Sequence, residues 1–204
     1  MDKPALIIFV RDPKLGKVKT RLAKTVGDLK ALIIYNELLD HTLSITKDLQ
    51  CNKYIFYADG INENDIWDNN IYRKKLQFGS DLGQRMSNAF LELFDIGHTK
   101  IIIIGSDCFE LTKEIIENAF EQLSVSNIVI GPSRDGGYYL LGMQALFDSL
   151  FQNVAWSTDD VYKETIKRIM LNKNSVSELI MLNDVDEETD ISEEMKIKTG
   201  LRIG

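Results

Sequence analysis

The sequence alternates short, strongly apolar runs with longer segments whose apolar residues recur at helical spacing. The runs ALIIFV at 5–10 and KIIIIG at 100–105 are continuous and rich in β-branched residues, which is typical of parallel strands buried on both faces of a sheet. Further strands are predicted at 53–58, 76–78, 127–131, 137–143 and 178–182. Helices are predicted at 29–49, 84–96, 113–124 and 159–171. Asp28, Thr112 and either Ser157 or Thr158 are predicted to cap three of these helices. The alternation predicts an α/β fold, namely a three-layer αβα sandwich with a mostly parallel central sheet.

The 204 residues contain no internal repeat and no Pro- or Ser-rich linker, so we expect one domain spanning 1–204. No apolar run approaches the roughly 18 residues that span a bilayer. The first apolar run is also too short for a secretory signal. We therefore expect a cytoplasmic protein without membrane insertion. Cys51 and Cys108 are too few for a disulfide framework.

Charge is distributed unevenly along the chain. The net charge is −7, yet residues 1–30 hold eight Lys or Arg and three Asp or Glu. An acidic protein is poorly suited to broad binding of nucleic acid or anionic membranes. A basic segment on an acidic body favours a small anionic ligand instead. The sequence leaves the oligomeric state undetermined.

The basic segment VRDPKLGKVKTRL, at 10–22, directly follows the first predicted strand. Ligands of α/β sheets bind beyond the carboxyl ends of the strands. Gly16 allows close backbone approach, and Arg11, Lys19 and Arg21 supply fixed positive charge, a combination that suits a polyphosphate. Neither a G-x-x-x-x-G-K-[ST] loop nor a G-x-G-x-x-G fingerprint is present. The alternative interpretation is a solvated basic turn.

A carboxylate follows the strongest predicted central strand. Asp107 lies just after 100–105, where it can hold Mg²⁺ or Mn²⁺ against phosphate oxygens, or merely cap a turn. Asp184 and Asp186 follow the last predicted strand and alternate onto the same side. We expect one of them, assigned to Asp186, to complete the metal site, with helix capping as the alternative.

Three further clusters carry weaker signals. Asp135, Gly136 and Gly137 lie between two predicted strands, where they can bind substrate or form an ordinary turn. Arg85, in the first turn of a predicted helix, is assigned to phosphate binding, although a surface arginine is the alternative. Trp156 is assigned to substrate binding, although tryptophan more often lies in the core.

Several of these motifs occur together in a recognisable order. They are Arg11-x-Pro13-x-x-Gly16-x-x-Lys19-Thr20-Arg21-Leu22, Leu82-Gly83-x-Arg85-Met86, Gly105-Ser106-Asp107-Cys108, Gly131-Pro132-x-x-Asp135-Gly136-Gly137-Tyr138 and Trp156-Ser157-Thr158. The ordered set resembles the radical-SAM/selenodomain-associated transferase 1 family of the nucleotide-diphospho-sugar transferase superfamily. That resemblance implies a glycosyltransferase-A-like fold and kinship with molybdenum-cofactor and phospholactate guanylyltransferases. Carried over by position, it implies phosphate contacts for Arg11, Gly16, Lys19 and Arg21 and a Mg²⁺ contact for Asp107.

The leading hypothesis is a Mg²⁺-dependent transferase that moves a nucleotidyl group from a nucleoside triphosphate to a small phosphorylated acceptor. Lys19, Arg21 and Asp107 are its expected catalytic residues, because neutralised and positioned phosphates need little protein acid–base chemistry. Glycosyl transfer from a nucleotide-sugar is the first alternative. A non-catalytic nucleotide-binding module is an alternative of another class.

Overall fold

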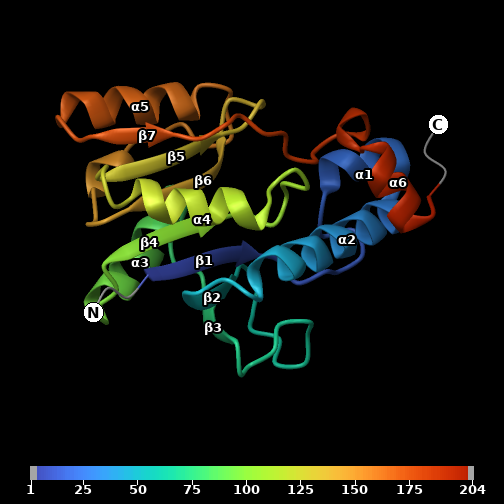
Figure 1. The fold of residues 1–204 in the computed structure, drawn as a ribbon. Coiled ribbons are helices and arrows are strands. Elements are labelled where there is room, and N and C mark those ends of the chain that lie inside the picture. Colours follow the sequence, from blue (N-terminus) through green and yellow to red (C-terminus); the bar gives the residue numbers. More distant parts are fainter. Residues whose placement is uncertain (1–3, 202–204) are drawn as a thin grey trace.

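A computed structural model describes residues 4–201 and arranges their strands in one seven-stranded sheet (Figure 1). The strands are β1 (Pro4–Val10), β2 (Asn52–Tyr57), β3 (Tyr72–Leu76), β4 (Lys100–Ile104), β5 (Ile128–Pro132), β6 (Tyr138–Met143) and β7 (Val176–Glu178). Their spatial order is β3-β2-β1-β4-β6-β5-β7. Of these strands only β6 runs antiparallel to its neighbours, so the predicted mostly parallel sheet is confirmed.

Helices cover both faces of the sheet. They are α1 (Thr20–Val26), α2 (Asp28–Thr46), α3 (Leu82–Asp95), α4 (Lys113–Gln122), α5 (Val161–Leu171) and α6 (Glu193–Thr199), with 3-10 turns at η1 (Asp148–Leu150) and η2 (Glu188–Asp190). In Figure 1, α1, α2 and α6 gather at one end of the molecule.

The alternation of side chains along β1 explains the two helical layers. Leu6 and Ile8 pack into a core with apolar residues of α2, α4 and α6. Ala5 and Ile7 pack into a second core with residues of α3 and α5. Successive strand residues point to opposite faces, so a continuous apolar run feeds both cores. The predicted three-layer αβα sandwich is confirmed.

The two edge strands differ from the prediction. The predicted strand 76–78 meets β3 only at Leu76, because β3 is built from YRKKL, whose charged side chains hide it from a hydrophobicity pattern. The predicted strand 178–182 shares only Glu178 with β7, although Leu182 forms an isolated parallel bridge with Ser133. Charged or short edge strands protect a sheet from pairing with another strand. The same charged or short sequences lack the apolar pattern by which a strand is predicted.

The predicted helix caps are confirmed in one case. The Thr112 side chain accepts a hydrogen bond from the Ile115 backbone N–H. Asp28 is the first residue of α2, whose N-cap is Gly27. The N-cap of α5 is Asp160, because the chain turns once more after Ser157 and Thr158 before the helix begins.

The topology brings loops far apart in sequence to one edge of the sheet. β1 and β4 are parallel neighbours, and the chain leaves β1 toward β2 on the other side. This is the switch point at which open α/β sheets bind ligands. Because β6 is antiparallel, its first residue, Tyr138, lies at the same edge as the carboxyl end of β4.

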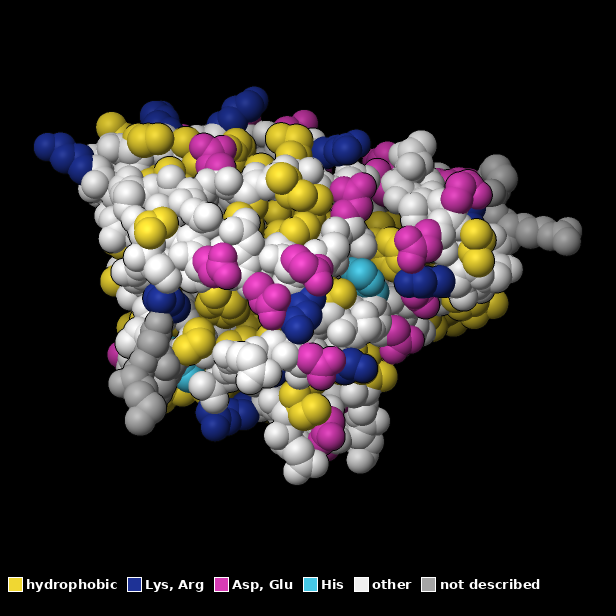
Figure 2. Space-filling view, viewed as in Figure 1, with side chains coloured by type: hydrophobic (Ala, Val, Ile, Leu, Met, Phe, Trp, Pro, Cys, Tyr) yellow, Lys and Arg dark blue, Asp and Glu magenta, His cyan; other side chains and the backbone are white. Residues whose placement is uncertain are grey.

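The surface shows no continuous basic field on the face that Figure 2 presents. There, acidic and basic side chains of the described residues are interspersed among hydrophobic ones. Among the described residues, no helix has both the length and the apolar character that crossing a membrane requires.

Candidate functional site

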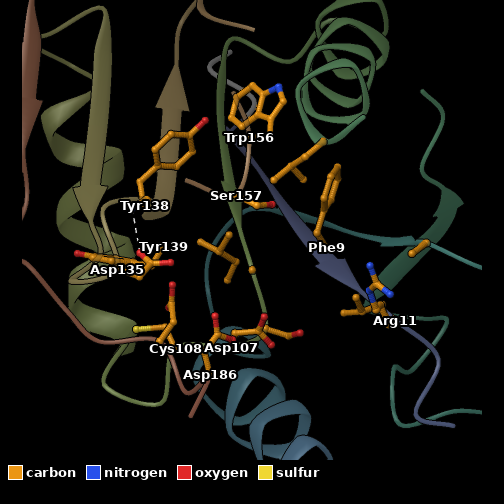
Figure 3. Close-up of a pocket in the computed structure, with 18 of the residues that line it drawn as sticks. Phe9, Arg11, Asp107, Cys108, Asp135, Tyr138, Tyr139, Trp156, Ser157 and Asp186 are labelled. Carbon is orange, nitrogen blue, oxygen red and sulfur yellow. Dashed lines mark hydrogen bonds between the residues drawn. The ribbon is translucent and has the colours of Figure 1, made fainter. Parts of the chain in front are cut away.

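A cleft of about 780 Å³ opens at the carboxyl ends of β1 and β4. Its walls come from the segment after β1, the loop after β4, the start of α3, the β5–β6 connection and the segments at 156–161 and 184–186. Figure 3 shows Asp107 and Asp186 close together at one end, and Phe9, Tyr138 and Trp156 at the other. The cleft therefore has a charged end and an aromatic end.

Lys19 lies at the centre of the charged end. Its Nζ is 3.0 Å from Asp107 Oδ1 and 3.0 Å from Asp186 Oδ1. The Lys19 side chain is 5% exposed, whereas those of Asp107 and Asp186 are 44% and 36% exposed. The buried ammonium is thus held by two carboxylates that still face solvent.

The backbone at Lys19 adopts an unusual conformation. Lys19 is the N-cap of α1 with φ 47° and ψ 47°, the left-handed region. Non-glycine residues in that region store roughly 1–3 kcal/mol of strain, and such residues concentrate at functional sites. The strained turn directs the Lys19 side chain toward the loop after β4 rather than along α1.

The carboxylates determine the charge state of Lys19. Burial alone would lower the pKa of the ammonium, but Asp107 and Asp186 outweigh burial and raise that pKa above its ordinary value. Lys19 is therefore a cation at neutral pH. The predicted catalytic residues Lys19 and Asp107 are therefore in direct contact, and Asp186 belongs to the same cluster.

Asp184 lies beside this cluster in a different environment. Its Oδ2 accepts a hydrogen bond of 2.9 Å from the Ser133 hydroxyl. Burial and the nearby Asp107 carboxylate raise the pKa of Asp184 to about 7. Of the two carboxylates considered after the last strand, Asp186 contacts Lys19 and Asp184 contacts Ser133.

Tyr35 of α2 is a site residue that sequence reasoning missed. Its hydroxyl accepts from the Arg11 backbone N–H at 2.9 Å and reaches the Arg11 carbonyl at 3.2 Å. It also lies 3.5 Å from Ser106 Oγ. Burial raises the pKa of Tyr35 to about 12. Tyr35 links the segment after β1 to the loop after β4, yet its place in a helix rich in apolar residues gave no sign of this.

The predicted cationic residues surround the same cleft. Arg11, Arg21 and Arg85 line it. Arg21 lies 3.7 Å from Asp186, and the Arg85 Nε–H donates to the Gly79 carbonyl at 3.2 Å. Asp12, an acidic residue within the basic segment, forms a 2.9 Å ion pair with Lys14.

Three of the four predicted substrate residues line the cleft, and the fourth packs against the backbone behind it. Asp135, Gly137 and Trp156 line the cleft, and Asp135 Oδ1 accepts the Gly137 backbone N–H at 2.9 Å. Gly136 lies outside the lining, with φ +87° and no room for a Cβ against the Asp159 backbone. Gly16, also outside the lining, has φ +70° and shapes the turn before α1.

The carboxylate pair suits a divalent cation that is shared with a phosphate. Among the described residues, no group of three or more His, Cys, Asp and Glu is arranged to hold a metal ion by itself. Mg²⁺ commonly uses one or two carboxylates together with waters and substrate phosphates. The space between Asp107 and Asp186 already accommodates a cation, the Lys19 ammonium. The donor set therefore fits a metal that binds with its substrate.

Comparison with solved structures identifies the fold. The chain is similar to a Desulfovibrio desulfuricans G20 protein, provisionally assigned as a nucleotide-diphospho-sugar transferase, at 31% identity and TM-score 0.85, covering 92% of this chain and 84% of that one. It is also similar to the inositol-1-phosphate CTP transferase of T. maritima, at 13% identity and TM-score 0.61, covering 100% and 98%. Rv0371c of Mycobacterium tuberculosis, solved with manganese, matches at 12% identity and TM-score 0.52, covering 93% and 95%. The fold is that of the nucleotide-diphospho-sugar transferases, as predicted.

Sequence comparison assigns the family. A search of curated protein sequences finds no match. A family model described as "Uncharacterized protein conserved in bacteria (DUF2064)" matches residues 42–158, more than half of the chain. Its match includes the loop after β4, with Asp107, and the β5–β6 connection. Together with the relative at 31% identity, this match shows that the chain is a member of the DUF2064 family.

Proposed function

We propose that this chain is a metal-assisted nucleotidyltransferase, which binds a nucleoside triphosphate in the cleft and transfers its nucleotidyl group to a small phosphorylated acceptor. The observation that carries the proposal is the Lys19 ammonium seated between the Asp107 and Asp186 carboxylates. Cations and carboxylates placed side by side are what a metal–triphosphate complex requires. The fold shared with nucleotide-diphospho-sugar transferases supports the same ligand class.

Each residue has a defined role in this proposal. Lys19 and Arg21 neutralise charge that develops on the phosphates, while Arg11 and Arg85 hold the phosphates in the cleft. Gly16 shapes the turn that presents Lys19. Asp107 and Asp186 would hold Mg²⁺ or Mn²⁺, and the bound ion supplies charge neutralisation and orientation of phosphate oxygens. An acceptor phosphate oxygen forms a bond to the α-phosphorus, the α–β phosphoanhydride bond breaks, and pyrophosphate leaves.

Glycosyl transfer from a nucleotide-sugar is the second candidate. Asp135 presents a carboxylate to the cleft, where it could deprotonate an acceptor hydroxyl. Asp135, Gly137 and Trp156 would contact substrate under either reaction. A nucleotide-binding module without catalysis makes a different prediction: it would release no pyrophosphate, and nucleotide binding would survive Asp107→Asn.

The proposal also covers the narrower family of the chain, its domain organisation and its location in the cell. We place the chain in the radical-SAM/selenodomain-associated transferase 1 family on its ordered motifs. We also propose that residues 1–204 act as one nucleotide-binding domain in the cytoplasm, with small molecules rather than nucleic acid as partners.

A thermal-shift panel tests the proposed function. Nucleoside triphosphates and nucleotide-sugars are compared with and without Mg²⁺, and released pyrophosphate is assayed in parallel. A ligand at 100 times its Kd adds about 2.7 kcal/mol to the free energy of unfolding. We expect a triphosphate to stabilise the protein, and Lys19→Ala and Asp107→Asn to remove that effect. Lys14→Ala is the matched control, because Lys14 pairs with Asp12 outside the cluster. Stabilisation by uridine diphosphate with none by any triphosphate would overturn the preference for nucleotidyl transfer.

A further inference from the structure

A second groove, of about 480 Å³, adjoins the aromatic end of the cleft. It runs between the first turns of α3 and the segment at 148–154, and it shares Asp81 and Trp156 with the main cleft. Its lining residues are Asp81, Gln84, Ser87, Asn88, Asp148, Phe151, Gln152, Asn153, Val154 and Trp156. The groove and the main cleft therefore adjoin at Asp81 and Trp156.

The two cavities differ in whether cationic side chains are present. The main cleft is lined by six aspartates and also by five cationic side chains, Arg11, Lys17, Lys19, Arg21 and Arg85. The groove residues include two carboxylates and no Lys or Arg among the described lining. Charge complementarity directs a phosphate to the cleft and away from the groove. A phosphorylated molecule that spans both cavities would place its phosphate in the cleft and an uncharged portion in the groove.

The polar groups of the groove are partly fixed and partly available. Asp148 accepts hydrogen bonds from the Ser87 hydroxyl at 2.9 Å and from the Gln152 side-chain amide. Gln84 uses its Oε1 to accept from the Ser80 backbone N–H, and Asn88 donates to the Phe78 carbonyl. Within the described residues, Gln84 Nε2 and Asn88 Oδ1 have no hydrogen-bond partner. The groove therefore offers a free donor and a free acceptor beside a fixed carboxylate.

Trp156 forms the wall between the cavities. The indole packs so closely on α3 that a Cβ built on Gly83 would lie 2.4 Å from its Cζ2. Gly83 thus provides the space that Trp156 occupies. A rigid indole beside amides and carboxylates combines an apolar surface for C–H groups with partners for hydroxyl groups.

We propose that this groove binds the uncharged, polyhydroxylated portion of the phosphorylated acceptor, whose phosphate remains in the main cleft. This inference rests on the proposed function in one respect, namely that the bound molecule is the acceptor of the transferred nucleotidyl group. Amide side chains can donate to hydroxyl groups and accept from them, and carboxylates can accept from them, whereas an aliphatic chain offers no partner for these hydrogen bonds. The carboxylates of Asp81 and Asp148 disfavour a second phosphate.

Side-chain NMR of the ¹⁵N-labelled protein tests this inference directly. Glucose, inorganic phosphate and methylamine are titrated separately into the ligand-free protein to high millimolar concentration. We expect glucose to shift the indole N–H of Trp156 and the amide signals of Gln84 and Asn88. The indole of Trp67, which is 2% exposed in the core, is the internal reference and should not move. Inorganic phosphate should shift the backbone signals of the segment after β1 instead.

Matched variants separate groove binding from unspecific effects. The double variant Gln84→Ala/Asn88→Ala should raise the apparent Kd for glucose, measured from the Trp156 indole shift, at least tenfold. That change equals about 1.4 kcal/mol of binding free energy. Asn118→Ala is the control, because Asn118 is an exposed asparagine of α4 on the opposite face of the sheet. An unchanged far-ultraviolet spectrum of each variant verifies the fold.

Three outcomes overturn the inference. They are the absence of glucose shifts at the groove amides, shifts there from phosphate, and stronger shifts from methylamine than from glucose. None of these depends on a nucleotide. Glucose binding in the groove without triphosphate binding in the cleft would refute the proposed function and leave the groove as a polyol site. Triphosphate binding without glucose shifts would refute the groove and leave the proposed function standing.

Discussion

Two buried lysines, Lys19 and Lys74, are paired with carboxylates that differ greatly in their exposure to solvent. The side chain of Lys19 is 5% exposed and that of Lys74, on β3, is 4% exposed. Lys74 lies 2.7 Å from Asp65 Oδ1 and donates to the Asn62 carbonyl at 2.9 Å. Each lysine therefore has its charge compensated inside the protein.

The carboxylates make the difference. Asp65 is 13% exposed, and its other oxygen accepts the Tyr57 hydroxyl, so both of its oxygens are occupied and little of the carboxylate reaches solvent. Asp107 and Asp186 are far more exposed and line the cleft. A closed ion pair can act only on the fold, whereas an open one can exchange its partner for a ligand. The burial of the lysine alone would not distinguish the two.

The largest expected effect is on stability, from Lys74→Met. Removing one partner of a buried ion pair leaves an unpaired buried charge and destabilises a protein by roughly 3–5 kcal/mol. We expect that loss in urea unfolding of Lys74→Met, with nucleotide affinity of the folded fraction unchanged.

Lys75→Met is the control for Lys74→Met, because Lys75 pairs with Glu92 at the surface. Exposed pairs contribute about 0–1 kcal/mol. A loss below about 1 kcal/mol in Lys74→Met would show that water reaches its cluster and would remove the contrast with Lys19.

The second effect is on binding, from Lys19→Met. The partners of Lys19 are solvated enough to remain charged without it, so we expect little change in the free energy of unfolding. Triphosphate affinity should fall about a hundredfold, equivalent to roughly 2.7 kcal/mol. Isothermal titration of the folded variant measures the affinity, with Lys14→Met as the control. Equal nucleotide affinity in Lys19→Met and wild type would make Lys19 a structural lysine like Lys74.

How much the sequence reveals also differs between these clusters. Asp107 is predictable because it follows a strongly β-branched strand, whose carboxyl end lies at the site. The contact between Lys19 and Asp186 joins residues 167 positions apart, and no local pattern encodes it. The Lys74 cluster is hidden in a strand and loop whose charges suggest a solvated surface. Tyr35 is likewise indistinguishable from a core residue until α2 is packed against β1.

The third effect concerns competition between two cations. Lys19 and a divalent metal would use the same oxygens, Asp107 Oδ1 and Asp186 Oδ1. We therefore expect Lys19→Met to bind Mn²⁺ about tenfold more tightly than wild type in the absence of nucleotide, a difference of about 1.4 kcal/mol. Isothermal titration with Mn²⁺ measures this, and Asp107→Asn should abolish it. Weaker Mn²⁺ binding by Lys19→Met would contradict competition.

The smallest effect concerns His41, a half-buried base with no carboxylate in contact. His41 bonds the Leu111 carbonyl at 2.9 Å and packs on Phe109. Burial lowers the pKa of His41 below its ordinary value of 6.5, whereas carboxylates reverse the effect of burial at Lys19. The folded protein then binds fewer protons than the unfolded chain, so stability present above pH 6.5 is lost as the pH falls through that value and below.

The measurement is the difference in unfolding free energy between wild type and His41→Gln as a function of pH, in which titrations common to both cancel. One proton limits the slope to about 1.4 kcal/mol per pH unit. We expect the wild type to lose stability relative to His41→Gln between pH 6.5 and 5, and the two to run parallel above pH 7. A difference of the opposite sign would mean that His41 is held as a cation, and that countercharge can reverse the effect of burial here without direct contact.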